Sequence, residues 1–83
     1  MPKNKQIFVA ATWDPDAKVW VAESEDVPGL VAEADSPESL LEKLKTRIPE
    51  LLEFNDSLFK EYSSLDLRVK YQREDRATLS AAA

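Results

Sequence analysis

Two kinds of hydrophobic pattern follow one another along this chain and predict its elements. Runs rich in β-branched and aromatic residues predict strands over residues 5–13, 18–24 and 30–34. Apolar residues then recur at steps of three or four, which predicts helix from residue 37 to about residue 61. Strict alternation over residues 64–72 predicts a fourth, half-exposed strand. The order β-β-β-α-β indicates a single α+β domain.

Turn and cap residues mark the boundaries between these elements. The segment 14–16, Asp-Pro-Asp, separates the first two strands, which we expect to pair as a hairpin. Pro28 and Gly29 fit a type II turn, because the second central position needs a positive φ that glycine adopts freely. Ser36 is the expected helix N-cap, with Pro37 at the first helical position.

The apolar stripe of the helix crosses Pro49 without losing its phase. A proline inside a helix removes one hydrogen bond and clashes with the preceding turn. We therefore expect one long helix kinked at Pro49, or two abutting helices over residues 37–47 and 49–61. The stripe consists of Leu40, Leu44, Ile48, Leu51, Asn55, Leu58 and Tyr62. A second row, Leu41, Ile48, Leu52 and Phe59, widens it.

A long helical crossover lets the fourth strand lie parallel to the first, which predicts a mixed sheet of order 3-2-1-4 with the helix on one face. One face should carry Ile7, Val9, Ala11, Val19 and Val21. The opposite face should carry Phe8, Ala10, Trp20 and Ala22. Because one helix covers only one face, the other must meet the later helix segment or another molecule. Self-association or partner binding is therefore expected.

Composition narrows the possible functions. With 83 residues, the chain can form one domain, expected over residues 1–73, and a flexible tail over residues 74–83. It has no cysteine and no histidine, which removes disulfides, zinc-finger ligands and the commonest general base. The net charge of −5 disfavours direct binding to nucleic acid. We expect a cytoplasmic protein without membrane segment or cofactor.

Carboxylates are the remaining catalytic candidates. The predicted topology is a partial ribonuclease H arrangement, in which clustered acids can hold two metal ions. The interior of the first strand, residues 6–12, contains no acid. Asp14 and Asp16 should lie at the opposite end of the sheet from Asp66. We therefore expect neither a metal site nor catalysis.

Seven residues around the first two strands are candidate partner contacts: Trp13, Asp14, Asp16, Trp20, Glu23, Glu25 and Asp26. The three acids after the second strand could hold a basic partner, although solvated carboxylates near a loop are also ordinary. Large aromatic residues on a small sheet are either interface anchors or core residues.

The strings "VWVAESEDVPGL" and "PELLEFN" resemble the HicB-like antitoxin family, in particular its small single-domain members formerly described as a domain of unknown function. The resemblance runs from about Ile7 to Tyr71. It implies a partial ribonuclease H fold without catalysis that binds a small basic toxin, a HicA-like ribonuclease that degrades mRNA. Many members also carry a C-terminal DNA-binding module. Nothing after Tyr71 could form one, so we expect no direct DNA binding by this chain.

The leading hypothesis is therefore a non-catalytic antitoxin of a type II toxin-antitoxin system that occludes its toxin. Two alternatives stay open. One is a metal-dependent ribonuclease H-like nuclease that uses Asp66 with helix or turn acids. The other is a self-associating domain with no toxin partner.

Overall fold

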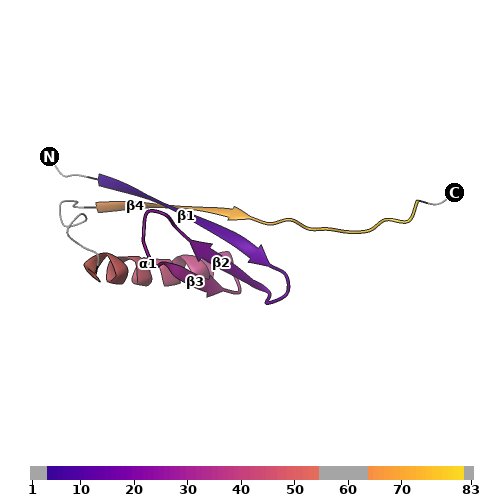
Figure 1. Ribbon diagram of the computed structural model, residues 1–83, viewed down its shortest axis with the longest axis horizontal. Coiled ribbons are helices and arrows are strands. Elements are labelled where there is room, and N and C mark those ends of the chain that lie inside the picture. Colours follow the sequence, from indigo (N-terminus) through magenta and orange to yellow (C-terminus); the bar gives the residue numbers. More distant parts are fainter. Residues whose placement is uncertain (1–3, 55–63, 82–83) are drawn as a thin grey trace.

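The structure is a computed structural model that describes residues 4–54 and 64–81 (Figure 1). Its elements are β1 (Asn4–Asp14), β2 (Val19–Glu23), β3 (Val31–Ala34), α1 (Pro37–Phe54) and β4 (Ser64–Gln72). The sheet order is β3-β2-β1-β4, with β4 parallel to β1 and the other neighbours antiparallel. The predicted α+β class, element order and mixed sheet order are confirmed.

The hairpin register corrects the predicted assignment of residues to faces. Ala11 lies opposite Ala22, and Asp14 lies opposite Val19. Paired residues share a face, so Trp20 and Ala22 join Ile7 on one side of the sheet. The prediction that Val19 and Val21 share the face of Ile7 is therefore wrong, as is the placement of Trp20 and Ala22 beside Phe8. Four residues, 15–18, separate the strands and set this pairing.

Helix α1 covers the face of the sheet that carries Ile7 and Trp20 (Figure 1). Its inner side is a row of leucine and isoleucine residues at steps of four, which bury because these positions lie on one side of a helix. The buried core consists of Ile7, Val9, Ala11, Trp20, Ala22, Val27, Leu30, Ala34, Leu40, Leu44, Ile48 and Leu52. Three residues of β4 pack against its border: Leu67, Val69 and Tyr71.

The helix runs through Pro49 without interruption as far as Phe54. The single-helix alternative is thus confirmed over these residues, and the separate helix beginning at Pro49 is wrong. The predicted stretch from 55 to 61 lies outside the described residues. At the start of α1, the Ser36 Oγ accepts a hydrogen bond from the Ser39 N–H at 3.1 Å. This contact confirms Ser36 as the N-cap.

The turn between β2 and β3 has the expected geometry. The Leu30 N–H donates to the Val27 carbonyl at 3.1 Å, and Gly29 has a φ of 83°. A Cβ at Gly29 would meet no atom within 4 Å, so the position is open in space and restricted only by its backbone. The glycine is required by conformation rather than by packing.

Replacing Gly29 by alanine should therefore lower the free energy of unfolding by about 1 kcal/mol, the backbone cost of a left-handed conformation. Urea denaturation followed by circular dichroism measures the loss. Gly29→Asn is the matched control and should lose less, because asparagine adopts positive φ more readily. Equal stability of Gly29→Ala and the natural protein would contradict the backbone explanation.

Residues 73–81 follow β4 as an extended, exposed segment without helix or strand, which we call the arm. It leaves the sheet in line with β4 and projects beyond the body of the domain (Figure 1). Within the described part of the chain, no helix is long and apolar enough to cross a bilayer.

Candidate interaction face

The side of the sheet opposite α1 has no layer packed on it by any described element (Figure 1), and we call this side the open face. Two large apolar residues are exposed there: Phe8 keeps 55% of its surface accessible, and Val31 keeps 69%. The face also carries Ala10, Thr12, Val21, Glu23, Glu33, Asp66, Arg68 and Lys70, by register with β1. An exposed phenylalanine offers a large apolar area with which a partner can make contact.

Phe8 lies in an open hollow of about 710 Å³. The hollow is lined by Phe8, Val9, Ala10, Glu23, Ser24, Glu25, Asp26 and Lys70. Strand β1 forms its floor. The acidic residues Glu23, Glu25 and Asp26, at the end of β2 and in the turn after it, form one side, which we call the acidic wall. An apolar side chain from a partner could cover Phe8 while a basic group meets the wall.

The turn after β2 holds Phe8 in place through side chains. The Asp26 Oδ2 accepts a hydrogen bond from the Phe8 N–H at 2.8 Å, and the Ser24 hydroxyl donates to the Phe8 carbonyl. The Asp26 N–H in turn donates to the Ser24 Oγ at 3.1 Å. Strand β2 ends at Glu23, opposite Ala10, so no residue of β2 is paired with Phe8. The two side chains bond to the backbone N–H and carbonyl of Phe8 in its place. Asp26, a predicted partner contact, is thus engaged in holding the hollow together.

Charge divides the open face into two halves. Glu23 and Lys70 flank Ala10 from opposite neighbouring strands, because both are in register with it. Arg68 is in register with Phe8 on the β4 side, whereas the acidic turn lies on the other side. The half formed by β2 and its turn is therefore acidic, and the half formed by β4 is mainly basic. A partner would be oriented by this asymmetry.

The predicted contacts near the β1–β2 turn form a separate group. The Asp14 Oδ1 accepts hydrogen bonds from the backbone N–H groups of Asp16 at 3.0 Å and Ala17 at 3.3 Å. Asp14 therefore orders the turn, while Asp16 is exposed. Because Val19 and Glu23 mark the two ends of β2, this turn lies roughly 13 Å from the acidic wall. The five predicted acidic residues thus form two groups rather than one site.

The two tryptophans belong to the helix side of the sheet. Trp20 is 8% exposed, and its ring centroid lies 5.4 Å from those of Trp13 and Tyr71. Trp13 is half-buried, with the Arg73 guanidinium 4.8 Å above its ring. Trp20 therefore offers little surface to a partner, and its main contacts are core contacts.

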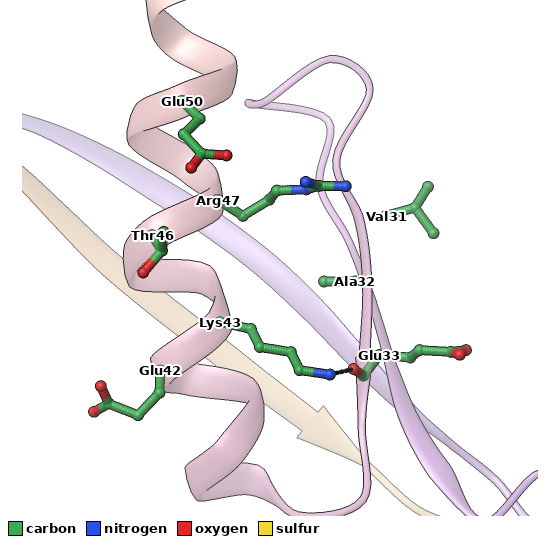
Figure 2. Close-up of a pocket in the computed structure, with 8 residues that line it drawn as sticks. All are labelled: Val31, Ala32, Glu33, Glu42, Lys43, Thr46, Arg47 and Glu50. Atoms are coloured by element: carbon green, nitrogen blue, oxygen red, sulfur yellow. Dashed lines mark hydrogen bonds between the residues drawn. The ribbon is translucent and has the colours of Figure 1, made fainter.

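The outer edge of β3 is covered by basic side chains of α1. The Lys43 Nζ donates to the Glu33 carbonyl at 2.7 Å, and Arg47 reaches from the helix toward β3 (Figure 2). The space between them is lined by Val31, Ala32, Glu33, Glu42, Lys43, Thr46, Arg47 and Glu50. Covering an edge strand with a helix discourages pairing with another strand. This edge of the sheet is therefore protected.

Acidic residues do not gather into a metal site within residues 4–54 and 64–81, where no group of three or more Asp, Glu, His or Cys side chains could hold an ion. Asp66 is in register with Gln6, whereas Asp14 lies eight positions further along β1. That separation corresponds to roughly 26 Å along a strand. It matches the separation of Asp66 from the turn acids expected from the sequence.

The pKa of the Tyr71 hydroxyl is raised in the folded protein. Its hydroxyl donates to the Pro37 carbonyl at 3.2 Å. Burial raises the pKa of Tyr71 above its usual value of 10.0, and the negative charge of Glu38 raises that pKa further. Both causes disfavour the phenolate in the folded protein.

Folding stability should consequently fall as the pH rises above about 10, because the tyrosine then ionises more readily in the unfolded chain than in the folded one. The stability that the neutral Tyr71 hydroxyl contributes is fully present below that pH. It is lost as the pH rises through the raised pKa of Tyr71 in the folded protein. Urea midpoints between pH 8 and pH 11 measure it. Tyr71→Phe removes the titrating group, so its midpoint should change less over that range; an identical decline in both proteins would contradict the assignment.

Comparison with known proteins places the chain in a family. Residues 6–79 match the family described as a domain of unknown function, DUF1902. The chain belongs to the DUF1902 family. The match extends through most of the arm, as far as residue 79.

The DUF1902 domain also resembles a solved structure, the crystal structure of hypothetical protein TTHA1013 from the extremely thermophilic bacterium Thermus thermophilus. The two share 44% sequence identity with a TM-score of 0.73, over 88% of this chain and 100% of that one. No curated protein matches this DUF1902 sequence significantly.

Proposed function

We propose that this domain is a non-catalytic binding module that occludes a small basic protein with its open face, in the manner expected of a HicB-like antitoxin. The partner class is a HicA-like ribonuclease toxin. The observation that carries the proposal is the exposed Phe8 in a hollow with an acidic wall. The partial ribonuclease H description of the fold belongs to the same proposal and is supported by the sheet order with a single crossover helix.

The chemistry of the hollow favours a protein partner. Phe8 supplies apolar area, while Glu23 and Glu25 are exposed carboxylates beside it. Such a combination can anchor an apolar side chain and attract lysine or arginine residues around it. The net charge of −5 adds a longer-range attraction for a basic protein.

Co-expression with the product of the neighbouring reading frame should yield a complex, and under this proposal the second chain is a small basic protein. We expect Glu23→Lys/Glu25→Lys to lower the association rate about tenfold at low salt, and the rate of the natural protein to fall as salt rises. Stopped-flow fluorescence measures both rates.

Glu50→Lys/Glu53→Lys on α1 is the matched control. It changes the net charge by the same amount as the first double variant, at exposed positions away from the open face. This control should retain most of the association rate. An equal loss in both double variants would assign the effect to total charge rather than to the acidic wall. Binding indifferent to salt and to all four substitutions would contradict the proposed electrostatics.

The competing nuclease function requires metal ions on clustered acids. A magnesium or manganese titration monitored by thermal denaturation distinguishes the two functions, because a bound ion stabilises the folded state. Under the proposed binding function, neither ion shifts the melting temperature, and the isolated chain does not cleave RNA.

A further inference from the structure

The second edge of the sheet differs from the protected edge at β3. Among the described elements, β4 pairs only with β1, so one side of this nine-residue strand has no strand beside it. A long edge strand with free backbone groups readily pairs with another chain. Leu65, near the start of β4, keeps 37% of its surface exposed.

The arm prolongs this open edge. Its base contacts the domain, because the Arg73 guanidinium lies 4.8 Å above the Trp13 ring. Within the arm, the Arg73 Nε is 3.0 Å from the Asp75 Oδ1. Beyond that point the arm extends away from the domain (Figure 1). Its residues are exposed, and Leu79 keeps 87% of its surface accessible. An extended segment without neighbours loses conformational entropy and gains little in return. The family match runs through residue 79, so most of the arm lies within the sequence that the family shares.

Symmetry restricts how a second copy could pair with β4 and the arm. A two-fold axis that continues the sheet must run perpendicular to it, and the two strands are then antiparallel. Directly opposed residues share a face of the sheet. The axis must therefore lie at the level of one residue, midway between that residue and the same residue of the second copy, and we call this an axis through that residue. Each possible register is therefore named by the one residue that faces itself.

The charges on the open face distinguish these registers. An axis through Arg68 or Lys70 sets like charges against themselves, and an axis through Val69 opposes these two residues to each other. An axis through Gln72 opposes Arg68 to Arg76. Each of these four registers therefore opposes at least one pair of like charges.

An axis through Tyr71 gives only attraction. It sets Arg68 opposite Glu74 and Asp66 opposite Arg76, and symmetry produces each pair twice. An axis through Leu67 also avoids repulsion, but it leaves the arm unpaired. In the monomer, Arg68 makes only a loose contact with Asp66, with the Nε 3.6 Å from the Oδ2 and both side chains about half exposed. Both side chains are thus available to a second copy.

We propose that residues 64–78 pair antiparallel with the same residues of a second copy, about a two-fold axis through Tyr71. The arm of each copy lies along β4 of the other, and the two sheets join into one. Leu65 then faces Ala77 of the second copy across the pair. The acidic halves of the two open faces lie away from the axis, so this interface leaves the Phe8 hollow accessible.

Sedimentation equilibrium of the full chain tests this pairing, and we expect a dimer. Arg76→Glu sets like charges opposite Asp66 twice and should raise the dimer dissociation constant about tenfold. The double variant Asp66→Arg/Arg76→Glu restores attraction and should recover most of the affinity. All of these side chains are exposed or half-exposed, so circular dichroism should show the natural fold in each variant.

Glu53→Lys on α1 is the control and should dimerise like the natural chain. A monomer at all concentrations would overturn the proposal, and would leave a strand from a different protein as the occupant of this edge. A dimer unaffected by Arg76→Glu, or one that the double variant does not restore, would also overturn it, because the interface would then lie elsewhere. None of these results bears on toxin binding, which is measured separately.

Discussion

Replacing Trp20 by alanine should remove a large part of the folding stability of this domain. Trp20 is buried at 8% exposure between Trp13 and Tyr71, with ring centroids 5.4 Å apart on both sides. Truncating a buried tryptophan costs about 3–5 kcal/mol, because the contacts are lost and a cavity remains. A domain of 83 residues has a total stability of roughly 4–12 kcal/mol. Urea denaturation followed by far-ultraviolet circular dichroism measures the loss.

Trp20→Phe is the matched control, since it keeps an aromatic ring between the same neighbours and should lose clearly less stability. Trp13→Ala should also lose less, because Trp13 is only half-buried. A loss below about 1 kcal/mol in Trp20→Ala would contradict its role as a core anchor. The same comparison separates folding from binding, because a Trp20 variant that unfolds loses its partner for structural reasons.

Replacing Phe8 by threonine should have the largest effect on partner binding. Phe8 is the exposed aromatic residue of the hollow, and a central aromatic residue of an interface commonly contributes about 2 kcal/mol or more. The affinity for the toxin should therefore fall about 30-fold or more. Threonine favours β-strand conformation, so the free energy of unfolding should change little. Isothermal titration calorimetry measures the affinity.

Leu79→Thr provides the control, because it removes an exposed apolar side chain of the arm, outside the hollow. Its affinity for the toxin should stay within about threefold of that of the natural protein. If Phe8→Thr binds as tightly as the natural protein, the hollow is not the contact surface. If both variants lose affinity equally, the partner binds along the β4 edge instead.

Local chemistry made most of the fold predictable from sequence. The only glycine adopts a positive φ in the expected turn, and Ser36 caps the helix as its position before Pro37 indicated. The four strand segments and the crossover then sufficed to predict the sheet order 3-2-1-4. These features depend on a few neighbouring residues or on general rules of chain connection.

The faces of the hairpin could not be obtained in the same way. They depend on the exact number of residues in the turn, because a change of one residue moves every side chain of β2 to the other face. Lys18 has a φ of 57°, and its N–H donates to the Asp14 carbonyl at 2.8 Å. A lysine gives no sequence signal for that conformation. As a result, the sequence pattern places Trp20 beside Phe8, whereas Trp20 is in the core.

The candidate site was only partly predictable for a related reason. Glu23 and Glu25 are recognisable in the sequence as acidic residues near a turn, and they line the hollow. Phe8 and Lys70 were missed as site residues, although strict alternation over residues 64–72 was visible. Their importance depends on which face α1 covers and on the parallel register of β1 with β4. Long-range pairing of this kind is not encoded in any short segment.

Nuclear magnetic resonance mapping of the isotope-labelled domain with the co-expressed basic protein tests the central claim most directly. If the open face is the binding surface, the largest backbone shift changes will centre on Phe8, Ala10, Glu23 and Glu25, while the outer side of α1 stays unchanged. Changes confined to α1, or the absence of any change at saturating partner, would contradict a binding role for the open face.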